Sequence, residues 1–202
     1  KISGQQKFVN RKQVLRRLKG KSCFIYSNHT LIPEDAFIPA IFMHKKNYLI
    51  ANPDVISIPG VKTIVEMLGA YPLPSTLNSH KNFKDGIIHY YNDKKNITIY
   101  PEAHIWKYYT GIRPFPAASF CYPVECNAPV VVLTNCFFKS KNPLRKRVVV
   151  KTFVSGPFYP DTSLSRSEAI QKLRDEVYES MIYESTKQEQ YKYKYEYVKK
   201  DV

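Results

Sequence analysis

Short apolar runs alternate with helix-like segments along this chain, and that alternation limits the fold more than any other feature of the sequence. The runs are rich in β-branched and aromatic side chains and end in polar or turn-forming residues, as buried strands do. They predict strands over 22–27, 48–51, 96–100, 130–133 and 148–154. Strands that alternate with helices build α/β domains. We therefore expect an α/β fold in which helices flank a mostly parallel central sheet, with residues 1–202 as a single domain.

The helix signals are strongest towards the end of the chain. Ser165 and Glu168 form a capping box. Four apolar residues follow on one helical face, namely Ile170, Leu173, Val177 and Met181. Weaker patterns predict helices over 35–43, 59–69 and 80–91, and residues 1–20 carry a weak helical stripe. Residues 190–202 alternate Tyr with Lys or Glu, so this tail is either an edge strand or an aromatic, basic strip that lies on a membrane or a partner.

The chain is strongly basic, with 31 Lys and Arg residues against 17 Asp and Glu and a net charge of +14. A field of that sign fits a nucleic acid, an anionic membrane surface or a phosphorylated substrate. The cluster of Lys139, Lys141, Arg145, Lys146 and Arg147, together with the abundant Tyr, favours a nucleic acid. However, no recognisable nucleic-acid motif is present. We expect no nucleic-acid partner and keep a non-enzymatic nucleic-acid-binding module as the alternative.

No apolar stretch approaches the ~18 residues of a membrane-spanning helix, and the longest is 36–43. No signal peptide is recognisable either. We expect a peripheral membrane protein. The chain begins at Lys1, so an anchor upstream of that residue stays open.

The cysteines form no C-x-x-C pair, and no His stands at a matching offset from the two closest, Cys121 and Cys126. This spacing argues against a structural zinc site, and we expect no metal site. The four residues, Cys23, Cys121, Cys126 and Cys136, are expected to be buried or half-buried free thiols in a reducing compartment.

The first candidate site follows the strand predicted over 22–27. Asn28 and His29 come directly after it, and the acidic pair of Glu34 and Asp35 lies at the start of the apolar helix. A carboxylate that holds one ring nitrogen of a histidine orients the ring as a general base and stabilises the imidazolium that forms. The alternative is an ordinary histidine in a loop.

Two further candidates follow the strand predicted over 96–100. Glu102 is either a solvated charge at the end of that strand or an acceptor of hydrogen bonds from substrate hydroxyls. His104 is a second titrating group or a loop residue, and we favour the loop. Further on, Gly111 permits a tight turn and Arg113 can fork onto a phosphate. The alternative for Arg113 is an exposed arginine in a loop.

In order along the chain, these motifs resemble the blocks of the lysophosphatidic acid acyltransferases, a family of glycerolipid acyltransferases. The strand that ends in Asn28-His29 is followed by an acid. Then come Gly-Ala-Tyr-Pro-Leu-Pro over 69–74, Tyr-Pro-Glu-Ala over 100–103, Pro-Phe over 114–115 and Ala-Pro-Val-Val-Val over 128–132. The similarity spans about residues 22 to 158, and the combination is specific although each piece is not. It implies a fold like that of glycerol-3-phosphate acyltransferase.

The resemblance implies an enzyme of phospholipid biosynthesis. It would move a fatty acyl group from a thioester of coenzyme A or acyl carrier protein to the hydroxyl of a lysophospholipid, in the first place 1-acylglycerol 3-phosphate. The family's histidine is the general base, assisted by an aspartate, which implies His29 and Asp35. The implied substrate-binding residues are Asn28, Glu102, Lys107, Gly111 and Arg113. Transfer is direct, so no acyl-enzyme, bound cofactor or metal is implied, and the protein would work at the cytoplasmic face of an anionic membrane.

The acidic pair departs from the family's spacing, which puts the acid at the position of Glu34. We prefer Asp35, because it directly precedes the apolar helix as the family's aspartate does, and Glu34 is the alternative. Successive residues at a helix start differ by about 100° in direction, so at most one of the two carboxylates faces the imidazole.

Two other blocks depart as well. Pro74 stands near the place of an arginine in the second block, and Ala103 replaces the glycine of the Pro-Glu-Gly block. His104 and Ile105 stand where Thr-Arg usually follows. Arg113 is the candidate for supplying the lost positive charge.

Overall fold

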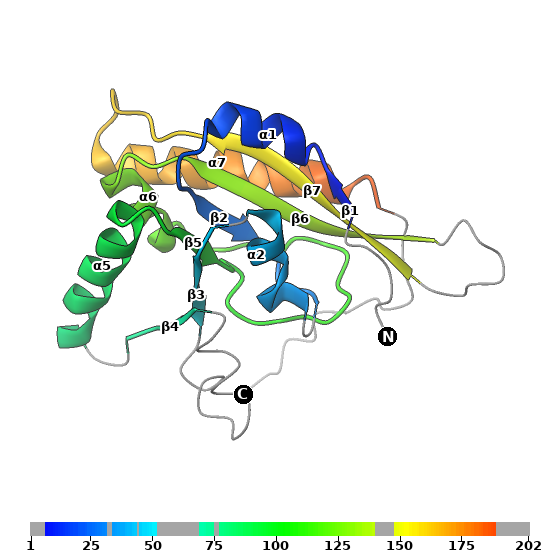
Figure 1. Cartoon of the computed structure of the whole chain (residues 1–202), viewed down its shortest axis with the longest axis horizontal. Helices are drawn as coiled ribbons and strands as arrows, with labels where there is room; N and C mark the ends of the chain where they lie inside the picture. The colour runs from blue at the N-terminus through cyan, green and yellow to red at the C-terminus, as the bar shows by residue number, and fades with distance from the viewer. Residues whose placement is uncertain are drawn as a thin grey trace, which may run out of the picture.

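A seven-stranded sheet forms the centre of the protein (Figure 1). The computed structural model describes residues 7–31, 34–43, 45–51, 69–74, 77–139 and 148–188. The strands lie in the order β1-β7-β6-β2-β5-β3-β4, and every neighbouring pair is parallel except β6 and β7. The predicted α/β fold with a mostly parallel sheet is confirmed. The strands are β1 (Lys7–Val9), β2 (Phe24–Ser27), β3 (Asn47–Ala51), β4 (Ala70–Pro72), β5 (Asn96–Ile99), β6 (Val130–Lys139) and β7 (Val148–Phe158).

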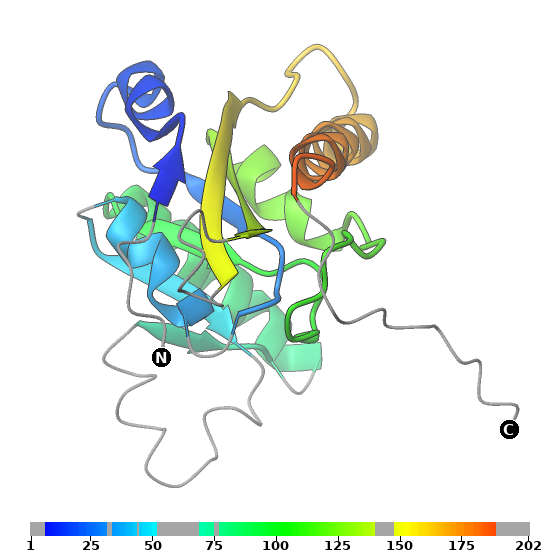
Figure 2. The ribbon, with the colours of Figure 1, turned by 90° about the vertical axis from the view of Figure 1, so that its right-hand side faces the viewer.

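Helices cover both faces of the sheet, as Figure 2 shows for α1 and α7. One face carries α1 (Arg11–Leu18) and α2 (Ile38–Phe42). The other carries α5 (Leu77–Asn92), α6 (Cys121–Glu125) and α7 (Arg166–Ser185). Short 3-10 turns, η1 (Glu34–Ala36) and η2 (Ala118–Phe120), precede α2 and α6.

The central strands are buried on both faces, which explains why they read as continuous apolar runs. In β2, Phe24 and Tyr26 pack towards α5, α6 and α7, whereas Ile25 packs towards α1 and α2. In β6, Val131 and Leu133 share the second of these faces. Burial of each such side chain contributes about 1.5–3 kcal/mol, so the two apolar layers fix the sheet between its helices.

The long helix α7 forms where its capping box predicts. The Glu168 N–H donates to Ser165 Oγ, and the Ser165 N–H donates back to the Glu168 carboxylate. Leu173, Val177 and Met181 are buried against the sheet. The predicted strands at β2, β3 and β5 and the predicted helix at α5 are found near their expected bounds, whereas β6 and β7 begin as predicted but extend past residues 133 and 154 to Lys139 and Phe158.

Two regions differ from the sequence predictions. The single helical stripe expected over residues 1–20 is instead a strand and a helix, because Asn10 takes a left-handed conformation (φ 64°) between β1 and α1. The helix expected over 35–43 is divided into η1 and α2, and Pro39 lies in the first turn of α2. The short edge strands β1 and β4 were not predicted, since three residues are too few to show a period.

Some predictions lie outside the described residues. These are the helix over 59–69 apart from Gly69, the tail over 190–202 and most of the basic cluster over 139–147. Of the helices that the structure describes, none has both the length and the apolar character needed to cross a membrane.

Candidate active site

The candidate site forms at the carboxyl ends of two neighbouring parallel strands. His29 follows β2 and Glu102 follows β5, and these strands pair directly in the sheet. The backbone N–H of His29 donates to Glu102 Oε2 at 3.3 Å. The fold therefore joins two motifs that lie 73 residues apart in the sequence. Ligand sites of open parallel sheets form at this edge.

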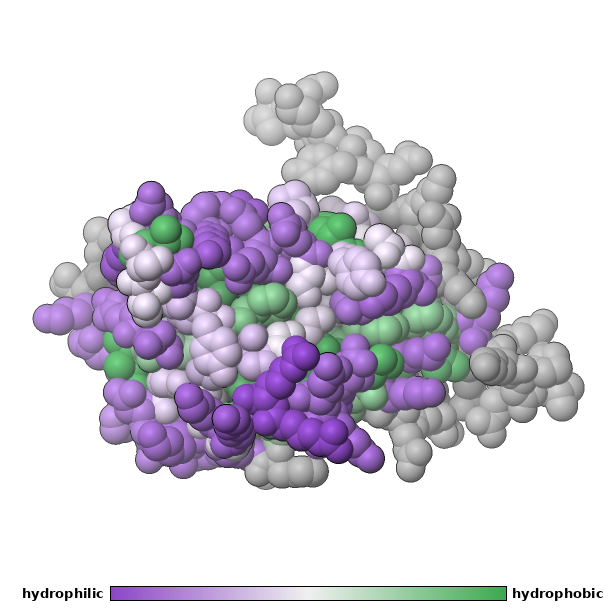
Figure 3. All heavy atoms as spheres, turned by 90° about the horizontal axis from the view of Figure 1, so that it is seen from above, coloured by the Kyte–Doolittle hydropathy of each residue, from purple (hydrophilic) through white to green (hydrophobic). Residues whose placement is uncertain are grey.

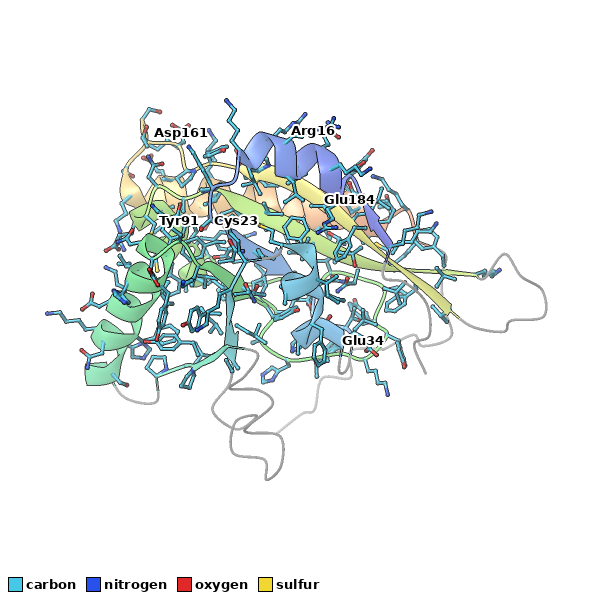
Figure 4. The ribbon with its side chains drawn as sticks, viewed as in Figure 1. Arg16, Cys23, Glu34, Tyr91, Asp161 and Glu184 are labelled. Atoms are coloured by element: carbon cyan, nitrogen blue, oxygen red, sulfur yellow. The ribbon has the colours of Figure 1, made fainter. Side chains whose placement is uncertain are left out.

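Asp35 is the acid that contacts the histidine. Its Oδ2 lies 2.8 Å from His29 Nδ1 and also accepts the backbone N–H groups of Thr30 and Leu31 at 3.0 and 2.9 Å. Because the carboxylate can only accept, Nδ1 carries the ring proton and Nε2 is left as the basic nitrogen. Glu34 forms no hydrogen bond or ion pair with His29 in the described part of the chain, and Figure 4 labels it at η1, the turn that precedes α2.

The carboxylate of Asp35 is held in a low-dielectric setting. Its residue is 3% exposed, and burial raises the pKa of Asp35 above its ordinary value of 3.8, against the lowering effect of the His29 hydrogen bond. Its second oxygen accepts Asn135 Nδ2 at 3.2 Å. The imidazole itself is 25% exposed and stacks on Tyr100, with ring centroids 4.4 Å apart. The ring is thus fixed in orientation yet open on one side.

Glu102 and Arg113 form a buried ion pair beside the histidine. Arg113 Nη2 lies 2.9 Å from Glu102 Oε2, and their side chains are 12% and 2% exposed. Arg113 Nε and the Arg113 backbone N–H also donate to this carboxylate. Burial raises the pKa of Glu102 above its ordinary value of 4.5, although Arg113 acts in the opposite direction. The Arg113 guanidinium lies over the Trp106 ring, 4.6 Å from its centroid.

The loop between Glu102 and Arg113 runs along the backbone that carries His29. The Trp106 N–H donates to the His29 carbonyl at 3.0 Å, and the Tyr108 N–H donates to the Thr30 carbonyl at 2.9 Å. Ala103, which replaces the glycine of the family pattern, has a left-handed backbone (φ 63°) of the kind that favours glycine. The loop therefore keeps the turn that the pattern implies without its glycine.

Three other residues of this loop were singled out in the sequence, and the structure shows what surrounds each of them. A Cβ added to Gly111 would lie 2.6 Å from the Tyr109 hydroxyl, so close packing, not a left-handed turn, is what requires glycine here. Lys107 Nζ lies over the Tyr108 ring at 5.2 Å. His104 is exposed in the loop, as favoured, and its carbonyl accepts Arg113 Nη2.

Asn28 holds the end of β2 against β6. Its Nδ2 donates to the Asn135 carbonyl at 3.1 Å, and its Oδ1 accepts the Asn135 N–H at 2.8 Å. The residue is only 3% exposed. Both polar atoms of the Asn28 amide are thus hydrogen-bonded within the protein, and its role in substrate binding stays a prediction.

Sequence reasoning missed Asn135. It lies within the apolar run of β6 and joins two hydrogen bonds, donating to Asp35 Oδ1 and accepting Thr152 Oγ1 at 2.7 Å. A polar side chain in the middle of a buried strand requires partners, so this residue could have been singled out as a site member. Its partner Asp35 could not have been named from the sequence, because the hydrogen bond spans 100 residues.

The cysteines are free thiols, two buried and two half-buried, as predicted. Burial raises the pKa of Cys23 and of Cys136 to about 12, which keeps both as thiols near neutral pH. In the part of the chain that the structure describes, no three His, Cys, Asp or Glu side chains gather closely enough to hold a metal ion.

Comparison with known proteins shows the fold. No protein-family profile matches the chain, and no curated protein matches it by sequence. Among solved structures, it is similar to the 1-acyl-sn-glycerophosphate (LPA) acyltransferase PlsC from Thermotoga maritima, with a TM-score of 0.60 and 16% identity. The match covers 92% of this chain and 73% of that one. The chain therefore has the fold of that acyltransferase, and the roles of the individual site residues stay predictions.

Proposed function

We propose that this protein is an O-acyltransferase that moves a fatty acyl group from an acyl thioester to the hydroxyl of a lysophospholipid, in the first place 1-acylglycerol 3-phosphate. The observation that carries the proposal is the 2.8 Å hydrogen bond between His29 Nδ1 and the buried Asp35 carboxylate, at the carboxyl edge of the sheet. The likeness of the fold to an LPA acyltransferase supports a general role in acyl transfer.

In the proposed reaction, His29 Nε2 takes the proton of the acceptor hydroxyl as the oxygen attacks the thioester carbonyl carbon. The tetrahedral intermediate then collapses: the new ester C–O bond is kept, the C–S bond breaks, and the leaving thiolate receives the proton from Nε2. Asp35 keeps the proton of Nδ1 in place and stabilises the imidazolium between these steps. The donor is a thioester of coenzyme A or acyl carrier protein, and the step needs no acyl-enzyme.

The acceptor would bind over the loop that leads from Glu102 to Arg113. The contacts between Arg113 and Glu102 use Nε and Nη2, and we assign Nη1 and the Lys107 ammonium to the acceptor phosphate. Lys107 and Arg113 belong to the same loop, and in this proposal one phosphate binds both of their charged groups. In this assignment Glu102 positions Arg113 and the His29 backbone, and Gly111 lets the loop close on Tyr109.

The enzyme would act as a peripheral protein on the cytoplasmic face of an anionic membrane. Its net charge of +14 supports attraction to anionic lipids. Phe37 and Ile41, which follow Asp35 by two and six residues, are 40% and 47% exposed and offer apolar contact beside the site. Co-sedimentation with anionic liposomes should weaken as salt rises, because exposed charges are screened. Binding that ignores both lipid charge and salt contradicts this part of the proposal.

The reaction is tested by measuring thiol release from acyl-coenzyme A and from acyl carrier protein thioesters, each with a panel of lysolipid acceptors. The expected result is release that depends on the acceptor, is fastest with 1-acylglycerol 3-phosphate, and is lost in the His29→Ala variant. Lys12→Ala, on the exposed face of α1, is the control for handling and folding. Release by the wild type without an acceptor, or an unchanged rate in His29→Ala, rejects the proposed function.

A further inference from the structure

A hollow lies at the opposite end of the parallel strands from His29. It has a volume of about 430 Å³, within the range of sites for small molecules, and we call it the amino-end pocket. Ser22, Lys94 and Pro129 line it, and they precede β2, β5 and β6 respectively. In Figure 4, Tyr91 from the pocket and Cys23 next to Ser22 lie well apart from Glu34 at the candidate active site.

The amino-end pocket carries positive charge without compensation. Lys19, Lys21 and Lys94 line it, and no carboxylate does. None of these lysines forms an ion pair with another described residue. The nearby Asp93 pairs with Lys95 instead, at 3.3 Å. Uncompensated lysines around a concave surface raise the local concentration of anions.

Another pocket, of about 590 Å³ near the start of α7, differs from the amino-end pocket in that its charged side chains are paired. It is also lined by basic residues, Lys84 and Arg166, but both pair with Glu125, which lines the same pocket, at 2.6 and 3.5 Å. Its Asp161 pairs with Lys172 at 2.6 Å. Charges there are neutralised within the protein. The basic character of the amino-end pocket is therefore not a general property of the molecule's hollows.

Ser22 gives an independent indication of a ligand. It is 4% exposed, it lines the amino-end pocket, and its hydroxyl has no hydrogen-bond partner among the described residues. A buried hydroxyl without a partner costs about 1–3 kcal/mol of stability, so such groups are rare. The Oγ itself is almost wholly buried, so a rotation of the Ser22 side chain towards the pocket would let the hydroxyl donate to a ligand oxygen.

The C-terminal ends of α5 and α6 lie near the pocket, and the carbonyl groups of a helix C-terminus repel an anion. This repulsion is weakened where those carbonyls accept hydrogen bonds within the protein. Carbonyls near the ends of α5 and α6 accept backbone N–H groups, from Lys95 to Tyr90 and from Ala128 to Pro123, at 3.1 and 2.9 Å. These hydrogen bonds satisfy some of the carbonyl groups that give each helix its partial negative charge. Burial raises the pKa of Tyr91 to about 12, so its hydroxyl stays a neutral donor near pH 7.

We propose that the amino-end pocket binds the phosphate groups of a small phosphorylated ligand, with Lys19, Lys21 and Lys94 as counter-charges and the Ser22 hydroxyl as a donor. The volume exceeds that of one phosphate, so the ligand carries a second phosphate or an organic part. A soluble phosphate ester and a phosphorylated lipid headgroup share this chemistry. The site is distinct from the proposed acyl-transfer site, since Ser22 precedes β2 and His29 follows it, at the opposite end of that strand.

The test uses the whole chain and measures binding directly, so it does not depend on acyl transfer. Pyrophosphate and ADP are titrated calorimetrically at constant ionic strength, and vesicles of phosphatidylcholine with and without phosphatidylinositol 4-phosphate form the lipid arm. The pocket variant is Lys19→Gln/Lys21→Gln/Lys94→Gln. The matched control is Lys12→Gln/Arg16→Gln/Arg17→Gln, which removes the same charge from the exposed face of α1. Figure 3, which views the molecule from above in Figure 1, shows that side as largely hydrophilic.

We expect saturable binding of one ligand, at least tenfold weaker in the pocket variant and within about twofold of the wild type in the control. Ser22→Ala, which keeps every charge, should weaken binding about tenfold. Binding of the soluble probes identifies a free ligand, and binding confined to the phosphorylated vesicles identifies a headgroup. Absence of binding to either source, equal losses in both triple variants, or full affinity in Ser22→Ala overturns the proposal.

Discussion

The two ends of the parallel strands differ in how their polar groups are satisfied. At the carboxyl end, His29 pairs with Asp35 and Glu102 pairs with Arg113, and all four side chains are wholly or largely buried. At the amino end, Lys19, Lys21 and Lys94 line a pocket without acidic partners, and the Ser22 hydroxyl has no partner among the described residues. The first end is organised before any ligand arrives, whereas the second lacks groups that a ligand would supply.

This difference has a physical consequence. Preorganised charges suit a site that must stabilise charge during a reaction, because no reorganisation is needed when that charge develops. Unpaired cations and an unpartnered donor suit a site that only binds. Substitutions at the carboxyl end should therefore affect rate and stability strongly. Substitutions at the amino end should affect ligand binding and leave the folded protein almost unchanged.

The largest expected effect is on the rate of the proposed acyl transfer. Asp35→Asn should lower it by on the order of 10⁴, since the amide neither holds the required tautomer nor stabilises the imidazolium. His29→Ala should lower it as much or more, and the double variant should be no worse than His29→Ala, because the pair acts as a unit. Thiol release at saturating donor and acceptor measures all three.

Glu34→Gln is the matched control, since it removes the neighbouring carboxylate, and its rate should stay within about threefold of the wild type. A rate loss in Glu34→Gln equal to that of Asp35→Asn would assign the acid to Glu34. Additive losses in the double variant would mean that His29 and Asp35 act separately.

The second effect is on stability. Arg113→Ala should lower the free energy of unfolding by about 3 kcal/mol, because it leaves the Glu102 carboxylate buried without its cation. Lys21→Ala at the amino end should change it by less than about 0.5 kcal/mol, because Lys21 is exposed and unpaired among the described residues. Urea unfolding measures both. Equal losses of unfolding free energy in Arg113→Ala and Lys21→Ala would show that the carboxyl and amino ends of the strands do not differ in how their charges are paired.

The double variant Glu102→Gln/Arg113→Ala checks the cause of that loss. It leaves no buried charge, so it should be more stable than Arg113→Ala alone. If it is less stable, the loss in Arg113→Ala comes from packing on Trp106 and not from the uncompensated carboxylate.

The third effect is the pH dependence of stability. Burial raises the folded-state pKa of Asp35 above 3.8, so the folded protein binds this proton more tightly than the unfolded chain. The stabilisation is complete below the unfolded pKa and is lost as pH rises through the folded pKa. The wild type should therefore lose stability relative to Asp35→Asn as pH rises from 3.8 through the raised pKa of folded Asp35, by about 1.4 kcal/mol per unit of pKa difference. Urea unfolding across that range measures the free energy of unfolding of both proteins. A wild type that gains stability relative to Asp35→Asn as pH rises contradicts the raised pKa of Asp35.

The sequence predicts the sheet better than the site. The buried strands and α7 could be predicted because their signals are local: apolar runs in β2 and β6, and a capping box at Ser165. The contact between Asp35 and His29 could be predicted as well, because the two residues are only six apart in the sequence. The contacts of Glu102 with Arg113 and of Asn135 with Asp35 depend on the loop path and on strand order, which no local pattern fixes.

The amino-end pocket lay further beyond prediction. Its lysines come from two separate connections, Lys19 and Lys21 between α1 and β2 and Lys94 between α5 and β5, and each alone resembles an ordinary exposed lysine after a helix. The unpartnered state of Ser22 could be recognised only after the chain around it was placed. Sequence patterns reveal which groups are polar, but only the fold shows which of them remain without partners.

The smallest expected effect compares one buried hydroxyl at each end. At the carboxyl end, Thr30 Oγ1 lies 3.1 and 3.0 Å from the Trp106 and Tyr109 carbonyls. Thr30→Val keeps the side-chain shape but removes this donor, and should cost about 1 kcal/mol. At the amino end, Ser22→Ala removes a hydroxyl without a partner, so it should be neutral or stabilise by up to about 1 kcal/mol. Urea unfolding should be measured in phosphate-free buffer, because a bound anion would stabilise the wild type and hide the gain. A loss in Ser22→Ala as large as that in Thr30→Val would show that the Ser22 hydroxyl is satisfied in the free protein, and the contrast between the two ends would fail at its most direct point.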